Sequence, residues 1–416
     1  MSGRKSKHAA QAPRLLALAL IYGGGSRWDA DSLVPPDDIR TKVRPNPIEC
    51  ARTCADCFPN NNNQWEHKMS YKLKLGFVAA IALAGQAFQA AAADSITVAE
   101  WGGASQAADR AAFFEPFTKD SGIKVVDDVW QGDLSTILSQ VQTKSYKWSL
   151  VRAETALVKR GCEQGILEKF DPALVGTAKD YLPGAFQPCG LAYATFSTNI
   201  AYNADKLKDN PPTSIKDFFD LKKYPGKRGI RRDPVYAMEL ALLADGVTLK
   251  DLYKVMRTRE GIDRAFKKLD TIKDQVVWWE SGSQPPQLLA DGEVTMSTVW
   301  GNRIVAAQKE GKNLQIVWDF PGLDYDWFIM PKGSPDAANA SKFLKFITEP
   351  KNAAKLSEVA PFGPVLKAAI PLVGNEYVDS LPTSPKNSKN AFAFNSEFYA
   401  DNQEDLTVRL TNWLQK

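Results

Sequence analysis

Three consecutive stretches decide the fold class of this chain: SITVAEW at residues 95–101, an amphipathic stretch at 106–121 and IKVVDDVW at 123–130. The two outer runs are rich in β-branched and aromatic residues, which favour strands. The stretch between them has apolar residues at helical spacing, and Gly122 follows it as a stop signal. A strand, a helix and a strand in this order predict an α/β fold with a largely parallel sheet.

The same alternation continues, with one interruption. A β-rich segment at 190–202 precedes a break at Pro211 and Pro212, and a second α/β region then covers 213–312. Another β-rich segment at 314–331 follows, and the remainder has a mostly helical pattern. A chain that leaves one lobe, builds another and returns predicts two lobes joined at a hinge that closes over a ligand. We expect lobe 1 to comprise 94–200 and 318–416, and lobe 2 to comprise 201–317.

Residues 69–93 have the pattern of a signal peptide. MSYKLK supplies a cationic start, residues 75–85 are apolar, and AFQAAAA precedes Asp94 as a small-residue cleavage site. A membrane anchor is the alternative, but the apolar run is about half of the roughly 20 residues that a spanning helix needs. We therefore expect a periplasmic protein that starts at Met69, with 1–68 as a disordered or non-genuine extension.

Charge and composition narrow the function of residues 94–416. The whole chain has 52 Lys and Arg against 48 Asp and Glu; residues 1–93 hold 12 and 7 of these, which leaves 40 and 41, a net charge of −1. Nucleic-acid binding therefore loses its electrostatic support. No histidine follows residue 93, which excludes Ser-His-Asp and Cys-His catalytic sites and His-ligated metals. We expect no cofactor and no metal.

Cys162 and Cys189 are the two cysteines beyond residue 93. An even number of cysteines in an oxidising compartment favours a disulfide between them. Two buried free thiols are the alternative.

Five segments, in order along the chain, resemble the extracytoplasmic solute-binding proteins of ABC importers, and most of all their spermidine/putrescine-binding branch. The resemblance covers nearly all of 94–416. It implies the two-lobed periplasmic-binding-protein fold, type II-like, with a hinge and a central ligand cleft. The segments are GILEKFD at 165–171, PPTSIKDFFD at 211–220, YPGKRG at 224–229, ADGEV at 290–294 and PFGP at 361–364.

The resemblance also implies ligand-binding residues. Trp101 and Trp300 match the aromatic residues that flank a polyamine, which combine apolar contact with cation–π attraction. Asp326 and Asp233 match the carboxylates that pair with its ammonium groups, which are costly to bury unpaired. The alternatives are a core role for the tryptophans and an N-cap role for Asp233.

The chain departs from the polyamine-binding pattern after its third predicted strand and on its returning strand. Arg152, Glu154 and Ala156 stand where a small hydroxyl residue and an aromatic residue are expected, and Asp324 replaces a tryptophan. Glu154 and Asp324 suit a polycation, whereas Arg152 suits a ligand that has its own carboxylate. Glu154 can alternatively cap a helix or pair with Arg152, and the two aspartates can be unpaired surface acids.

A cationic run beside a Pro-Gly turn resembles a nucleic-acid patch, but we interpret it as a solvated surface. It comprises Lys227, Arg228, Arg231 and Arg232.

These observations predict a non-catalytic, monomeric periplasmic receptor. It captures a small solute, a putrescine- or spermidine-like polyamine, and delivers it to an ABC permease in the inner membrane, without nucleic-acid partners. An amino-acid or opine-like zwitterion is the alternative ligand. A secreted hydrolase or lyase that uses carboxylates such as Asp324 and Glu280 is the alternative class.

Overall fold

The computed structural model describes residues 94–416. The predicted extension at 1–68 and signal peptide at 69–93 lie outside the described residues. None of the helices formed by residues 94–416 combines the length and apolar character needed to cross a bilayer.

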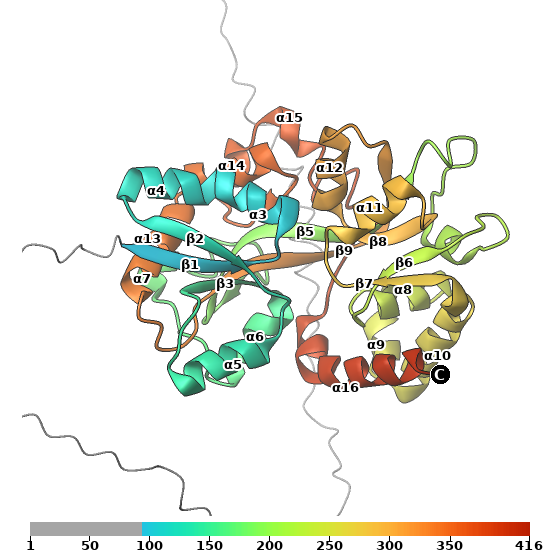
Figure 1. Cartoon of the computed structure of the whole chain (residues 1–416), viewed down its shortest axis with the longest axis horizontal. Coiled ribbons are helices and arrows are strands. Elements are labelled where there is room, and N and C mark those ends of the chain that lie inside the picture. The colour runs from blue at the N-terminus through green and yellow to red at the C-terminus, as the bar shows by residue number, and fades with distance from the viewer. Residues whose placement is uncertain (1–93) are drawn as a thin grey trace, which may run out of the picture. The chain divides into compact units, whose positions relative to one another are not determined.

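One mixed sheet runs through the whole described region, in the order β2-β1-β3-β9-β5-β8-β6-β7. Three parallel strands lie at each end of this order, and two long strands, β5 and β9, lie between them (Figure 1). The strands are β1 Ser95–Glu100, β2 Lys124–Val129, β3 Leu150–Glu154, β5 Gly190–Asn203, β6 Arg228–Arg231, β7 Val276–Trp279, β8 Met296–Trp300 and β9 Leu314–Ile329, with short β4 Phe186–Gln187, β10 Gly363–Pro364 and β11 Phe392–Ala393 at their margins.

The prediction of a largely parallel sheet is wrong for the centre of the molecule. β5 and β9 pair antiparallel with each other, and they also pair antiparallel with β8 and β3. The reason is topological, because the chain leaves the first set of parallel strands on β5 and returns to it on β9, in the opposite direction.

Helices cover both faces of the sheet (Figure 1). Beside β1, β2 and β3 lie α3 Gly103–Asp109, α4 Glu115–Ser121, α13 Ala337–Ile347 and α14 Pro350–Val359 on one face, and α5 Leu134–Thr143 and α6 Thr155–Glu163 on the other. Beside β6, β7 and β8 lie α11 Gln284–Asp291 and α12 Gly301–Lys309 on one face, and α8 Ala237–Ala244, α9 Leu252–Met256 and α10 Arg259–Asp270 on the other. The remaining helices are short α7 Pro172–Val175 and α15 Asn375–Val378, and the C-terminal α16 Ser396–Leu414.

Two hydrophobic cores lie on either side of a crossing point in β5 and β9. Tyr193 of β5 and Trp327 of β9 belong to the first core, and Ile200 and Val317 belong to the second. The pairing slips between the cores, because Thr198 pairs with Gly322 whereas Ile200 pairs with Val317. Residues 318–321 of β9 therefore lie opposite a single residue of β5. This irregularity is the crossing between the two lobes.

The C-terminal helix α16 packs with the second core. Phe398, Leu406 and Trp413 of α16 are buried there, and α16 also contacts α6 of the first lobe. We therefore propose that α16 belongs with lobe 2, and that the return segment of lobe 1 ends before it. The other predicted lobe boundaries stay predictions.

The cationic run at 227–232 is only partly solvated, so the surface interpretation was wrong for half of it. Arg228 is buried in β6, and its guanidinium donates hydrogen bonds to the backbone oxygens of Phe218 (2.6 Å), Gly226 (2.9 Å) and Tyr224 (2.6 Å). These hydrogen bonds stabilise the loop at residues 218–226. β6 itself was missed because its first and last residues, Arg228 and Arg231, are charged.

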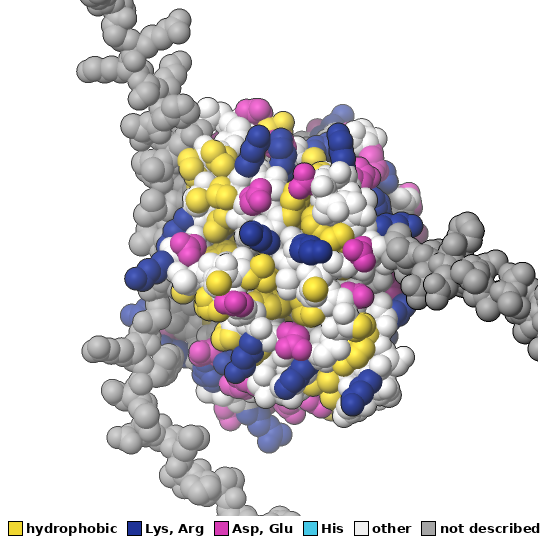
Figure 2. Space-filling model, turned by 90° about the vertical axis from the view of Figure 1, so that its left-hand side faces the viewer, with side chains coloured by type: hydrophobic (Ala, Val, Ile, Leu, Met, Phe, Trp, Pro, Cys, Tyr) yellow, Lys and Arg dark blue, Asp and Glu magenta, His cyan; other side chains and the backbone are white. Residues whose placement is uncertain are grey.

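The face that Figure 2 shows has no large patch of charges of one sign. Lys and Arg side chains there are interspersed with Asp and Glu, and small hydrophobic areas lie between them (Figure 2). Nucleic-acid binding normally uses a gathered basic stripe. This face therefore gives no support to a nucleic-acid partner.

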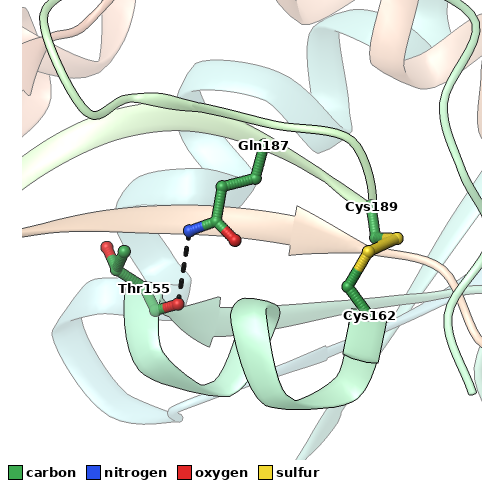
Figure 3. The surroundings of a disulfide bond; sticks show 4 residues. All are labelled: Thr155, Cys162, Gln187 and Cys189. Atoms are coloured by element: carbon green, nitrogen blue, oxygen red, sulfur yellow. Dashed lines mark hydrogen bonds between the residues drawn. A yellow bond between two sulfur atoms is a disulfide. The ribbon is translucent and has the colours of Figure 1, made fainter. Parts of the chain in front are cut away.

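The predicted disulfide between Cys162 and Cys189 is present (Figure 3). It joins the last turn of α6 to the residue that precedes β5. Nearby, the side-chain amide of Gln187 donates to the backbone oxygen of Thr155, at the other end of α6 (3.4 Å; Figure 3). Gly190 lets the strand approach the helix, since a Cβ there would lie 2.7 Å from Val158 Cγ1. The disulfide thus fastens a helix that is already closely packed.

Replacing both cysteines by serine should lower the free energy of unfolding by about 3 kcal/mol, because the bond closes a loop with a sequence separation of 27. Urea denaturation of oxidised wild type, reduced wild type and the double variant measures this. Equal midpoints for oxidised and reduced wild type would contradict it.

Candidate ligand-binding site

The carboxyl ends of five parallel strands meet at the crossing between the lobes. Trp101 follows β1, while Glu154, Arg231, Trp279 and Trp300 are the last residues of β3, β6, β7 and β8. In open α/β sheets, ligands bind outside the carboxyl ends of the strands, where the strand order reverses. The topology therefore places the candidate site at this crossing.

Two small, partly open cavities lie here, and they share Glu154, Phe196 and Trp300 as walls. Each measures about 20 Å³, which is room for about one water molecule. The Asp324 cavity is lined by the shared residues together with Thr198, Ile230, Arg231, Val235, Tyr236, Ala237, Trp279, Thr298, Asp324 and Phe394. The Arg303 cavity is lined by the shared residues together with Trp101, Ser105, Arg152, Asn302, Arg303, Asp326 and Phe362.

Tryptophan rings form the wall between the cavities. The ring of Trp300 lies 6.1 Å from that of Trp101 and 5.8 Å from that of Trp279 between centroids. Trp101 also stacks on Trp130, at 5.4 Å. Trp278, the neighbour of Trp279, instead packs against the second core, because adjacent strand residues face opposite ways. The structure thus brings together the two tryptophans that the sequence predicted.

Arg152 is buried and bound to acids of the first lobe. One guanidinium nitrogen donates to Glu100 Oε2 (3.2 Å), Ser105 Oγ (2.8 Å) and Asp109 Oδ2 (2.7 Å), and the other donates to Asp326 Oδ2. The predicted alternative, an Arg152–Glu154 pair, is wrong, because Arg152 pairs with Glu100, Asp109 and Asp326 while Glu154 pairs with Arg231. Asp326 borders the Arg303 cavity, but its charge is already compensated by Arg152.

This network holds more acid than base. Burial raises the pKa of Glu100 well above its usual value and raises the pKa of Asp109 to about 6. Burial is the largest single effect on Arg152 and would lower its pKa, but the surrounding acidic groups, Asp326 foremost, together outweigh burial and raise it. Arg152 therefore stays charged and fully occupied, which leaves it poorly suited to receive a ligand carboxylate.

Asp324 is a buried acid without an ion pair among the described residues. Thr155 Oγ1 and the backbone N–H of Tyr325 (2.8 Å) donate to its carboxylate. The pKa of Asp324 is raised to about 8, mainly by burial and in part by the charge of nearby Glu154. An ammonium group in the Asp324 cavity would compensate this charge.

Glu154 faces the same cavity and has a partial partner. Arg231 donates to it at 3.3 Å, and burial raises the pKa of Glu154 above its usual value. The guanidinium of Arg231 also lies 5.1 Å from the centroid of the Trp300 ring. Glu154 makes no side-chain capping bond to α6, so the alternative capping role is not supported.

Arg303 is the opposite of Asp324, a buried cation without an ion pair in the part of the chain that the structure describes. It donates to the backbone oxygen of Trp101 at 3.4 Å, and its Nε has no hydrogen-bond partner. Burial lowers the pKa of Arg303 to about 10, and the like charge of Arg152 adds to this. A ligand carboxylate would compensate it.

Asp233 does not line either cavity. Its Oδ1 accepts the backbone N–H of Val235 at 2.8 Å, in the turn before α8. This bond closes a local turn. The N-cap position of α8 is Tyr236, so the N-cap role that was the alternative for Asp233 is not confirmed. The other five predicted residues border the cavities.

Sequence reasoning missed Arg231, Tyr236 and Arg303 as wall residues. Arg231 was assigned to a surface because it belongs to a run of four cations beside a Pro-Gly turn. Arg303 had a usable signal, since it opens the helix that follows the strand ending at Trp300. Residues in the first turn after a parallel strand share that strand's carboxyl edge.

Comparison with known proteins identifies the family. The family described as "Bacterial extracellular solute-binding protein" matches residues 112–383. The chain belongs to this family. It is 41% identical over 336 residues to the "Gamma-aminobutyric acid-binding protein" of Pseudomonas aeruginosa, covering 80% of this chain and 95% of that protein.

More distant relatives agree on the class. The "Spermidine/putrescine-binding periplasmic protein" of Escherichia coli is 24% identical over 284 residues, covering 65% of this chain and 78% of the relative. The solved structure of the PBP MotA from A. tumefaciens B6 in complex with glucopine has a TM-score of 0.72 and 30% identity, covering 77% of this chain and 99% of that one.

The chain is thus a solute-binding component of an ABC importer, a class that delivers small molecules to a membrane permease, and not an enzyme. The two-lobed periplasmic-binding-protein fold with its central cleft is confirmed. The hydrolase or lyase alternative is wrong.

Asp324→Asn should stabilise the solute-free protein at pH 8 and have little effect near pH 4. The folded-state pKa of about 8 exceeds the unfolded value of about 4, so wild-type stability falls as pH rises between these values. Asparagine keeps the acceptor for Thr155 and carries no charge.

The advantage of this variant should grow by on the order of 1 kcal/mol per pH unit between pH 5 and 8. Urea titrations of both proteins at several pH values measure it. A constant loss of stability at every pH would contradict this account.

Proposed function

We propose that this protein captures a small linear zwitterion with an ammonium group at one end and a carboxylate at the other, such as γ-aminobutyrate. The observation that carries the proposal is the separation of two buried ionisable groups without ion pairs, the carboxyl group of Asp324 and the guanidinium of Arg303, by the Trp300 wall. A ligand with both charges would compensate both.

The ammonium end is assigned to the Asp324 cavity. Burial raises the pKa values of the acids Asp324 and Glu154, and a cation beside them would stabilise their charged forms. Trp300 and Trp279 add aromatic faces, which attract a cation. The backbone of the ligand would lie along Trp300 between the cavities.

The carboxylate end is assigned to the Arg303 cavity. Arg303 supplies a guanidinium fork, which suits planar carboxylates. Arg152 lines the same cavity but is occupied by Glu100, Asp109 and Asp326. We therefore assign the ligand carboxylate to Arg303, and not to Arg152 as expected from the sequence.

A diamine fits this arrangement less well. Its second ammonium group would lie beside Arg303, and two like charges in a buried site repel. The 41% identity with a protein named for γ-aminobutyric acid, against 24% with one named for spermidine and putrescine, also supports a zwitterion. The predicted polyamine ligand is therefore replaced as our preferred ligand.

Calorimetry with three four-carbon probes should separate these readings. We expect γ-aminobutyrate to bind, and putrescine and butyrate to bind at least about 100-fold more weakly, since each leaves one buried charge uncompensated. Equal or tighter binding of putrescine would contradict the proposal and favour a polyamine as the ligand.

Two charge-removing variants form matched controls. Asp324→Asn should weaken the binding of γ-aminobutyrate by about 100-fold, because it leaves the ammonium end of the ligand unpaired. Arg303→Gln should weaken it by a similar factor, because it leaves the carboxylate end unpaired. Arg303→Gln should leave the affinity for putrescine unchanged or increase it. Loss of putrescine binding in Arg303→Gln would count against this assignment.

We also propose that the protein acts in the periplasm as a monomer after export by residues 69–93. The support is the signal-like sequence together with relatives named as periplasmic. Amino-terminal sequencing of exported protein should find a start near Asp94. Mature, ligand-binding protein that keeps residues 1–68 would contradict it.

A further inference from the structure

Tyr236 forms part of the wall of the Asp324 cavity in a costly backbone conformation. Its φ is 68° and its ψ is −32°, a backbone conformation that residues other than glycine rarely adopt. Such a residue costs on the order of 1–3 kcal/mol and persists only when its surroundings hold it. Functional sites are where such residues gather.

Glu239 holds the backbone of Tyr236. The N–H of Tyr236 donates to Glu239 Oε2 at 2.9 Å, while Glu239 Oε1 accepts the hydroxyls of Tyr253 (2.9 Å) and Tyr399 (2.6 Å). Tyr253 lies on α9 and Tyr399 lies on α16. One carboxylate therefore connects the cavity wall to two helices of the second core.

Glu239 is fully buried and forms no ion pair within residues 94–416. A buried carboxyl group is costly, and a core position is normally better filled by an apolar side chain. Burial raises the pKa of Glu239 to about 7. Packing alone does not account for an acid here.

The side chain of Tyr236 reaches the crossing strand. Its hydroxyl donates to the backbone oxygen of Phe320 at 3.3 Å, and Phe320 also has a positive φ, 51°. Phe320 belongs to residues 318–321, where the pairing of β9 with β5 slips between the lobes. The cavity wall is therefore bonded directly to the hinge.

The hinge has braces of its own. Phe320 N–H donates to Asn390 Oδ1 (3.2 Å), and Asn390 Nδ2 donates to Asp319 Oδ1 (2.6 Å). Asp319 Oδ2 accepts the backbone N–H of Ile215 at 2.9 Å. The crossing is thus fixed from three directions, of which only Tyr236 touches the cavity.

We propose that Glu239 is a positioning residue for solute capture, which holds Tyr236 against the cavity and so couples occupancy of the site to the crossing segment of β9. This inference rests on the proposed function only in taking the Asp324 cavity as the solute site. It does not depend on which solute binds. Contact with Tyr236 would stabilise the crossing in the geometry of the closed lobes, and dissociation would require that geometry to be released.

The first test uses amide hydrogen exchange on solute-free protein. Glu239→Met removes all three acceptor contacts while keeping length and apolar packing. It should raise exchange at the amides of Tyr236, Asp319, Phe320 and Gly322, the residues of 319–322 that have an N–H, by about tenfold or more. Tyr236→Phe, which removes only the bond to Phe320, should raise exchange at 319–322 and serves if Glu239→Met does not fold.

The matched control is Tyr253→Phe with Tyr399→Phe. It strips two donors from Glu239 and lowers the melting temperature, but leaves the bond to Tyr236. A purely structural role predicts that exchange at 319–322 follows the melting temperature in all variants. Our proposal predicts that the control leaves these amides unchanged. Unchanged exchange in both Glu239→Met and Tyr236→Phe would overturn it.

The second test follows dissociation of γ-aminobutyrate by tryptophan fluorescence in stopped flow. Glu239→Met and Tyr236→Phe should release γ-aminobutyrate about tenfold faster than wild type and the control, since conformational steps commonly set such rates. Wild-type rates in both variants would overturn the proposal. If wild type itself does not bind γ-aminobutyrate, the proposed function fails, and the exchange experiment still decides the role of Glu239.

Discussion

The antiparallel pairing of β5 with β9 is the constraint on which the rest of this structure depends. These strands are the sheet's only long members within residues 94–416, and each contributes side chains to both hydrophobic cores. Because they run through both lobes, the carboxyl ends of the parallel strands on either side face a common crossing. The slip in pairing at residues 318–321 lets one sheet serve two lobes, and it places Asp324 and Asp326 beside the hinge.

Buried charge then determines what the crossing can bind. Arg152 is balanced by Glu100, Asp109 and Asp326, so the most conspicuous cation of the site is internally compensated. Asp324 and Arg303 are left as an acid and a base in separate cavities. Leaving a charge unpaired in a protein interior costs several kcal/mol, which a ligand of matching charge can recover. The site is therefore suited to a ligand with one charge of each sign.

Much of the fold was predictable from sequence because strand and helix periods alternate clearly. β1 and β2 fall within the predicted ranges 95–101 and 123–130, and Cys162 and Cys189 form the predicted disulfide. The antiparallel centre was not predictable from local patterns, since strand direction depends on where the chain returns. β6 escaped notice because Arg228 and Arg231 look solvent-exposed in sequence.

The site was predicted less well than the fold. The family resemblance and the departures from it pointed to Trp101, Trp300, Glu154 and Asp324, but sequence could not reveal which acids pair internally. Asp326 and Arg152 neutralise each other across β3 and β9, a contact between residues far apart in sequence. Such pairing determines which charges remain for a ligand.

The most direct test of the central claim is a crystal structure of the protein with γ-aminobutyrate bound. We predict that the ammonium group lies within hydrogen-bond distance of Asp324 and that the carboxylate contacts the guanidinium of Arg303, with the methylene chain against Trp300. A ligand carboxylate bound to Arg152, with the Asp326 pair broken, or a ligand bound in the reverse orientation, would contradict the account.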